Sequence, residues 1–167
     1  MSYDVFVQGI GLVASALVIL SFLQKSDQWF KILVGAGAVV FGVHFFLLTA
    51  YSGAFVAFIN AMRTFTSMRF HNSNKLLYFF LSLYLLAAFV TYEDAIDLLP
   101  IISGSIGTIA LFKLSGLPLR VAFVFNEIGW LSYAVIVQSI GGMINNSFTL
   151  CANLITMYRL LKDKKNG

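Results

Sequence analysis

Four polar side chains inside one apolar stretch are the residues of this sequence best suited to chemistry. The stretch is 53–70, and at the helical spacing i, i+3, i+4 and i+7 it carries Asn60, Arg63, Thr64 and Ser67. All four fall on one face of a helix long enough to cross a bilayer. An unpaired polar group in hydrocarbon costs several kcal/mol, and an intramembrane Arg is tolerated only beside a partner, water or a solute. This face is therefore predicted to meet other helices around a polar site.

A second charged side chain, Glu127, lies at the same depth. At about 1.5 Å per residue, Arg63 lies about 15 Å in from Gly53 and Glu127 about 14 Å in from Pro118, close to the middle of a core of about 30 Å. We hypothesise that the two side chains pair. Three interpretations stay open: a structural salt bridge, a wall of a solute site or proton-coupling pair, and Arg63 reaching toward the inner surface with Glu127 protonated.

Three further side chains are candidate binding residues. Asn126 precedes Glu127, and Trp130 follows it by three residues on the same face, where an indole could stack on a sugar ring or a nucleoside, or simply pack. His44 is predicted near the outer surface, and a lone His there is more typical of a hydrogen bond between helices than of a ligand contact. No second His or Cys lies at metal-ligand spacing, so neither a metal nor a cofactor is predicted.

The composition indicates an integral membrane protein. Hydrophobic residues make up 59% of the 167 residues and charged residues only 11%, whereas about a quarter of the residues of soluble domains are charged. The lipid bilayer is therefore a predicted partner. The formal net charge of +4 comes from basic residues at the ends of apolar runs, which argues against a nucleic-acid partner. No enzyme is predicted, because no paired carboxylates, His cluster or activated nucleophile share one depth.

Seven apolar runs approach or reach the length that spans a membrane. They are 5–23, 29–49, 53–70, 76–92, 97–112, 117–137 and 141–161. Ten of the eleven Lys and Arg residues lie on one side of these runs, and the eleventh is the intramembrane Arg63. Because basic loops favour the cytoplasmic side, this pattern predicts seven transmembrane helices with the N-terminus outside and the C-terminus inside.

An internal repeat organises these runs. Shifting the chain by 89 residues superposes Lys31 on Arg120 and places runs one to three on runs five to seven. Because an odd number of helices separates the starts of the two units, both have the same orientation. The predicted fold is all-α, with a first three-helix bundle over 1–70, a linker helix with its loops over 71–96, and a second bundle with a basic tail over 97–167.

The same shift aligns two polar rows. Ala57, Asn60, Thr64 and Ser67 fall on Asn146, Thr149, Asn153 and Thr156, which again share one helical face. Such groups commonly hydrogen-bond helix to helix, typically at about 0.6 kcal/mol each. Asn60 and Asn153 are the stronger candidates for a solute pathway, because a primary amide has four hydrogen-bonding positions and one neighbour rarely satisfies them.

Three helices, one linker helix and three more, with an Asn in the third and seventh, resemble the SWEET and PQ-loop (MtN3-like) transporters, and the layout is similar to that of the PnuC vitamin transporters. More narrowly, the whole chain, from QGIGLVASALVILSFLQKSD to LCANLITMYRLLKDKK, resembles the YgjV-type bacterial inner-membrane family. The SWEET resemblance implies that Asn60 and, a few residues displaced, Asn153 line a solute cavity. Leu23–Gln24 and Phe112–Lys113 stand where the PQ signature would, so the resemblance does not extend to proline-kink gating or fix a sugar as the substrate.

These features predict a bacterial inner-membrane facilitator or exchanger for a small polar solute such as a sugar, nucleoside or organic acid. Two bundles would alternate access to a midplane site, with Arg63 as counter-charge for an anion or Glu127 as carrier for a coupled proton. The alternative is a non-transporting structural or regulatory protein whose polar rows only hold helices together. A cavity reaching Asn60 favours transport, and a dry seam favours the alternative. A homo-oligomer is left open.

Overall fold

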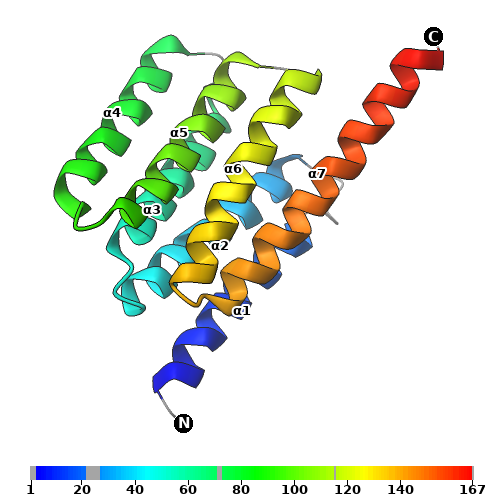
Figure 1. Cartoon of the computed structure of the whole chain (residues 1–167). Helices are drawn as coiled ribbons and strands as arrows, with labels where there is room; N and C mark the ends of the chain where they lie inside the picture. The colour runs from blue at the N-terminus through cyan, green and yellow to red at the C-terminus, as the bar shows by residue number, and fades with distance from the viewer. Residues whose placement is uncertain (1–2, 22–26, 71–72, 115, 167) are drawn as a thin grey trace.

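The computed structural model describes residues 3–21, 27–70, 73–114 and 116–166, and this part of the chain is all-helical. Seven α-helices and one short 3-10 helix follow in order (Figure 1): α1 (Tyr3–Ser21), α2 (Asp27–Leu47), α3 (Tyr51–Ser67), α4 (Asn74–Thr91), η1 (Ala95–Asp97), α5 (Leu98–Lys113), α6 (Gly116–Ile136) and α7 (Ile140–Asn166). Within the described residues, each α-helix coincides with most of one of the seven apolar runs. The predicted all-α class is confirmed.

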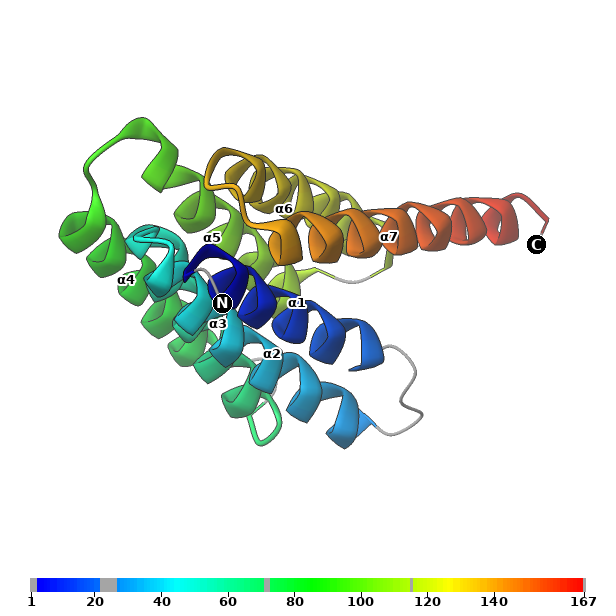
Figure 2. The same ribbon diagram turned by 90° about the horizontal axis from the view of Figure 1, so that it is seen from below.

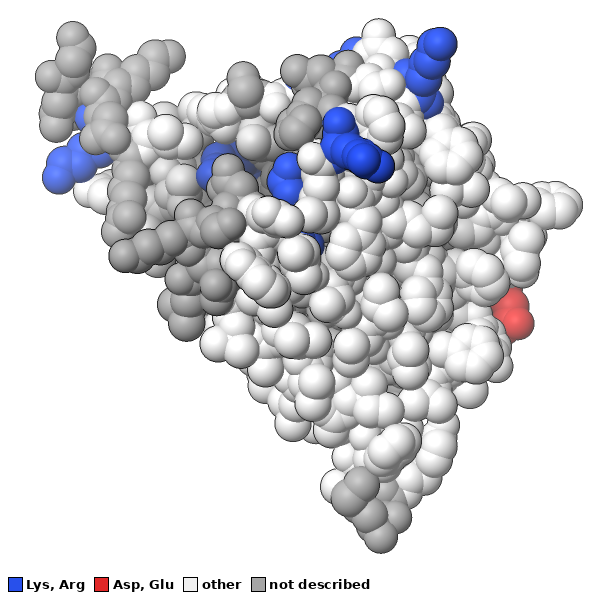
Figure 3. Space-filling view, turned by 180° about the vertical axis from the view of Figure 1, so that it is seen from behind, with Lys and Arg blue, Asp and Glu red and all other residues white. Residues whose placement is uncertain are grey.

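Successive α-helices run in opposite directions, so the two termini lie at opposite ends of the molecule (Figure 1). We call the end that holds Asp4, Glu93, Asp94 and Asp97 the acidic end, and the end where α3, α5 and α7 finish the basic end. Figure 3 shows that the Lys and Arg side chains of one face gather toward the basic end, and that the lower half of this face shows none.

Neighbouring helices form two sets of three. Helix α2 contacts both α1 and α3, and α6 contacts both α5 and α7, while α4 packs against α3 and α5 (Figure 2). The two sets meet where α1 contacts α7 and where α3 contacts α5. Under the 89-residue shift, α1 corresponds to α5 and α3 corresponds to α7. The contact of α1 with α7 is therefore equivalent to the contact of α5 with α3, and the same helix arrangement occurs twice.

The turns before α3 and α7 have matching backbone geometry. Thr49 and Gln138, which are 89 residues apart, have φ angles of 58° and 53°, and among the described non-glycine residues only these two have positive φ. The amide of Ala50 donates to the Phe45 carbonyl at 2.9 Å, and the amide of Ser139 donates to the Ala134 carbonyl at 2.8 Å. Both turns are therefore Schellman motifs, in which a left-handed residue ends the helix.

Four segments in the described ranges are long and apolar enough to cross a membrane: α1, α4, η1 with α5 (Ala95–Lys113), and α6. The apolar part of α2, Lys31–Leu47, is shorter, and α3 has 17 residues and includes Arg63. Large apolar side chains cover the outside of the helices, with Phe89 89% exposed and Leu85 71% exposed. Such a surface suits lipid, because soluble monomers rarely expose large continuous apolar patches.

An aromatic cluster joins the two sets of helices. The ring of Phe45 on α2 stacks on Trp130 of α6 with centroids 6.0 Å apart and meets Tyr133 edge-on at 5.7 Å. These three side chains belong to one buried core that also includes Phe80 and Tyr84 of α4. The cluster lies on the acidic side of the cavity described next.

Candidate functional site

A central cavity of about 500 Å³ lies between the two sets of helices. Side chains from α1, α2, α3, α5, α6 and α7 line it, and among them are five of the seven predicted site residues: Asn60, Arg63, Asn126, Glu127 and Trp130. The cavity volume is within the range of about 300 to 1,000 Å³ that is typical of small-molecule sites. The structure thus brings most of the predicted polar residues to one place.

The repeat relation runs through the cavity lining. Five pairs of lining residues differ by 89 in number: Val34 and Phe123, Ala38 and Glu127, Phe41 and Trp130, Ala57 and Asn146, and Asn60 and Thr149. The two helix sets therefore present equivalent positions to the same cavity. In two of these pairs, an alanine of the first set stands at the position equivalent to Glu127 or Asn146 of the second set. The two walls therefore differ chemically.

Arg63 on α3 is held by a polar network that reaches α5 and α4. Its Nη1 donates to the Thr108 hydroxyl at 2.6 Å, and that hydroxyl lies 3.1 Å from the Tyr84 hydroxyl. Tyr84 in turn donates to Oδ1 of Asn60 at 2.8 Å. The buried Nε of Arg63 has no partner. The network fixes the guanidinium beside the cavity and leaves it a free donor.

Glu127 on α6 is held separately. The Thr149 hydroxyl of α7 donates to Oε2 of Glu127 at 2.6 Å. No ion pair joins Glu127 to Arg63, both of which lie in the described part of the chain and line the same cavity. The hypothesised pairing is therefore not found, because Arg63 turns toward α5 and Glu127 toward α7. The cavity contains a fixed cation and a fixed carboxyl group that do not bond to each other.

The structure places His44 and Asn153 outside the cavity lining. His44 is fully buried, with Nδ1 2.9 Å from the Val7 carbonyl and Nε2 2.7 Å from the Ser139 hydroxyl. It joins α1, α2 and the start of α7, as the packing interpretation predicts. Asn153 donates through Nδ2 to the Arg120 carbonyl at 3.0 Å and joins α7 to α6 nearer the basic end, with Oδ1 buried and unpartnered.

Two hydrogen-bond chains, whose members are in part related by the 89-residue shift, close the acidic end above the cavity. In one, the Gly53 amide donates to the Tyr133 hydroxyl at 3.0 Å, and Tyr133 lies 2.9 Å from the Ser52 hydroxyl, which donates to Asp97 at 2.7 Å. In the other, the Gly142 amide donates to the Ser139 hydroxyl, and that hydroxyl lies 2.7 Å from Nε2 of His44. Gly142 and His44 are the repeat equivalents of Gly53 and Tyr133. Each chain ties one helix set to the other.

The cavity extends in the opposite direction, toward the basic end. Its lining there includes Lys31 at the start of α2, Phe70 just after α3 and Phe112 in the last turn of α5. The Nζ of Lys31 donates to the Ser67 carbonyl at 3.3 Å. The two ends thus differ, with buried hydrogen-bonded side chains on the acidic side and cavity-lining residues on the basic side.

Sequence reasoning missed several residues of this site. Tyr84 and Thr108 connect Arg63 to Asn60, and Asn145 and Phe41 line the cavity. The fourth run reads as a linker helix because it is almost wholly apolar, yet its Tyr84 hydroxyl lies near mid-run. That mid-run hydroxyl, with Ser82 two residues before it, was an available signal. The sequence also contained a signal for Asn145, because this residue precedes Asn146 in a helix that already carries a polar row.

Replacing Tyr133 by Phe is expected to lower the free energy of unfolding by about 1–3 kcal/mol, because the buried Gly53 amide loses its acceptor. Thermal unfolding in detergent micelles measures the effect. Tyr158→Phe is the matched control, since Tyr158 is 67% exposed, and it is expected to stay within about 0.5 kcal/mol of the parent. Equal melting temperatures for the two variants would contradict the closed acidic end.

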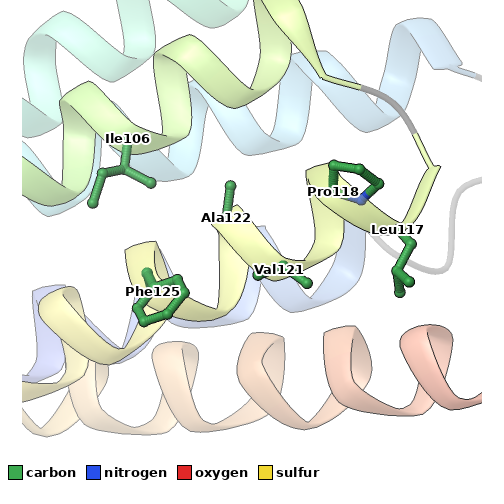
Figure 4. Close-up of a pocket in the computed structure, with 6 residues that line it drawn as sticks. All are labelled: Ile106, Leu117, Pro118, Val121, Ala122 and Phe125. Atoms are coloured by element: carbon green, nitrogen blue, oxygen red, sulfur yellow. The ribbon is translucent and has the colours of Figure 1, made fainter.

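A second hollow lies on the outside of the helices. Figure 4 shows its lining, Ile106 from α5 and Leu117, Pro118, Val121, Ala122 and Phe125 from α6, all apolar. Its volume is about 510 Å³, similar to that of the central cavity. Because no polar side chain lines it, this groove suits hydrocarbon rather than a polar solute, and the central cavity is the candidate site.

Comparison with known proteins identifies the family. The model of the family Imp-YgjV, described as bacterial inner membrane protein, matches residues 5–164. The chain is also similar to inner membrane protein YgjV of Escherichia coli (strain K12), with 33% identity over 167 residues, covering 93% of this chain and 86% of that protein. No solved structure matches. The membrane class inferred from the composition agrees with both matches, and the chain belongs to the Imp-YgjV family of bacterial inner membrane proteins.

Proposed function

We propose that this protein is a seven-span transporter, a facilitator or exchanger, that moves a small polar solute by alternating access of two three-helix bundles joined by α4. The observation that carries the proposal is the central cavity, which both helix sets line at equivalent positions. It contains an Arg and a Glu that do not pair with each other. Charged groups within a membrane mark solute or ion pathways by default.

The helix arrangement supports this mechanism. The equivalent turns at Thr49 and Gln138, and the equivalent contacts of α1 with α7 and α3 with α5, support the proposal that the sets are parallel repeats. In transporters built from such repeats, the solute site lies at the repeat interface near the bilayer midplane, and rocking of one unit against the other alternates access. With the basic end in the cytoplasm, we assign this structure to the inward-facing state of the proposed cycle.

Cysteine accessibility tests the proposal without knowledge of the solute. The single native Cys151 is exposed, so the experiment uses a Cys151→Ala background. Thr64→Cys places a thiol on the cavity lining, and Met62→Cys, on the same helix at a side chain that is 52% exposed, places one toward lipid. We expect membrane-impermeant thiol reagents to label Thr64→Cys from the cytoplasmic side of inverted vesicles and to leave Met62→Cys unlabelled.

The non-transporting alternative makes the opposite prediction. If the polar rows serve only to hold helices together, the seam contains no water and Thr64→Cys is as protected as Met62→Cys. Protection of both thiols from both sides of the membrane would contradict transport through this cavity. Counterflow in proteoliposomes, screened with sugars, nucleosides, amino acids and organic acids, then tests movement of solute directly.

A further inference from the structure

Around Arg63, the free hydrogen-bonding atoms on the α3 wall of the cavity are donors. The Thr64 and Ser67 hydroxyls of the same wall donate to backbone carbonyls of α3 and keep only acceptor capacity. Oδ1 of Asn60 already accepts the Tyr84 hydroxyl, which leaves its Nδ2 hydrogens. Arg63 uses Nη1 on Thr108 and keeps an unpartnered buried Nε. A guanidinium and an amide N–H₂ group both donate hydrogen bonds. This wall therefore suits an anionic group such as a carboxylate.

On the α6 and α7 wall the free atoms are mainly acceptors, beside the N–H₂ group of Asn145. Glu127 receives Thr149 on Oε2, which leaves Oε1. Asn126 and Asn146 each donate through Nδ2 to a backbone carbonyl, and the Oδ1 atom of each remains available as an acceptor. Oδ1 of Asn145 is buried without a partner. A carboxylate with neighbouring amide oxygens accepts hydrogen bonds from a cation or a multiple donor. This wall suits an ammonium group.

The difference between the walls departs from the repeat. A shift of 89 residues places Ala152 at the position of Arg63 and Ala38 at the position of Glu127, while an aromatic residue remains on both sides as Phe41 and Trp130. Arg63 and Glu127 thus carry opposite charges on the two walls, with Lys31 as a second cation nearer the basic end, whereas the aromatic surface is shared. A solute that fits has two unlike charged ends and an uncharged body.

We infer that the solute is a small zwitterion of the amino-acid class, with its carboxylate at Arg63, its ammonium at Glu127 and the neighbouring amide oxygens, and its side chain against Phe41 and Trp130. This inference rests on the proposed transport function and specifies the substrate of the same site. A monoanion or a monocation leaves one charged wall unmatched, and a sugar or nucleoside leaves both. Unmatched buried charges weigh strongly against such solutes.

The test is counterflow by the purified full chain in proteoliposomes. Radiolabelled L-serine, L-glutamine and L-phenylalanine are the probes, each challenged with its unlabelled self, with the amine that lacks the carboxylate and with the acid that lacks the amine. For L-phenylalanine these analogues are phenethylamine and 3-phenylpropionate. We expect at least one amino acid to exchange. Each single-charge analogue is expected to need a concentration about 30-fold higher than that of the unlabelled amino acid to compete equally.

Two variants add a signature that a structural role alone does not produce. Arg63→Gln is expected to remove the advantage of the zwitterion over the amine, and Glu127→Gln its advantage over the acid. Equal competition by all three compounds in the wild-type protein, which needs no variant to fold, overturns the inference. So does the absence of counterflow for every amino acid. If glucose, adenosine or succinate exchanges in that case, transport stands and only the substrate class fails. If none exchanges and Thr64→Cys stays unlabelled, both proposals fail.

Discussion

Replacing Arg63 by alanine is expected to lower amino-acid counterflow by about 30-fold or more while the protein remains folded. Arg63 is the cation of the α3 wall, and its Nε is buried without a partner in the solute-free structure. A solute carboxylate in the cavity would pair with the charge of this guanidinium. Truncating one member of a buried charged pair leaves the other charge uncompensated, which is the main source of the expected loss.

Melting temperature separates this role from a structural one. Arg63 makes no ion pair with Glu127, so its removal breaks only the bond to Thr108. We expect the melting temperature of Arg63→Ala to fall by only a few degrees. Arg63→Lys keeps the charge but not the planar fork, and intermediate activity is expected. Arg69→Ala, which removes an exposed Arg just after α3, is the matched control with normal activity. Normal counterflow by Arg63→Ala would remove Arg63 from the site.

A measurement that needs no solute tests the same charge. In the Thr64→Cys background, an anionic sulfonate thiol reagent and a cationic trimethylammonium reagent of similar size report the field inside the cavity. Arg63 and Lys31 both line this region, so the anionic reagent is expected to react relatively faster there than on a free thiol. Arg63→Ala should lower that ratio, and a ratio unchanged by the substitution would contradict a guanidinium facing the cavity.

Helix positions could be predicted from the sequence because lipid imposes a simple requirement. Every spanning segment must satisfy its own backbone hydrogen bonds and present apolar side chains, so each run of apolar residues marks one helix. The 89-residue shift was visible in the positions of basic loops such as Lys31 and Arg120. Its structural counterpart, the left-handed pair Thr49 and Gln138, could not be foreseen, because neither Thr nor Gln favours positive φ.

The contents of the cavity were predictable in part. Depth along a helix follows from 1.5 Å per residue, and it correctly brought Arg63 and Glu127 to the same cavity. Depth does not give the rotation of a helix about its axis, so the partners Thr108 and Thr149 were missed. Asn153 lies one turn beyond Thr149 on the same face, and at that level α7 already packs against α6. One turn separates a cavity residue from a packing residue.

Replacing Gly141 by alanine is expected to destabilise the protein by about 3 kcal/mol or more, or to prevent its assembly. A Cβ on Gly141 would lie 2.1 Å from the carbonyl oxygen and 2.2 Å from the carbonyl carbon of Gly11. These are backbone atoms, so relief requires α1 to move away from α7. Glycine at such a contact lets two membrane helices approach closely. Thermal unfolding and the folded fraction after purification measure the effect.

Gly9→Ala is the control on the same pair of helices, because a Cβ there meets nothing within 4 Å. It is expected to be neutral or to stabilise by about 0.5–1 kcal/mol, since alanine is the better helix former. If Gly141→Ala and Gly9→Ala unfold at the same temperature, α1 and α7 do not approach at Gly11.

The contact at Gly11 also bears on closure of the acidic end. Gly11 packs directly against the His44 ring, since a Cβ on Gly11 would lie 2.7 Å from it, and His44 bonds Ser139 just before α7. Displacing α1 therefore pulls on one of the two hydrogen-bond chains that close this end. In the proposed orientation, any Gly141→Ala protein that folds should show Thr64→Cys labelled from the periplasmic side, where we expect the parent to be protected. Unchanged protection in a destabilised variant would mean that the chain through Tyr133 closes the acidic end by itself.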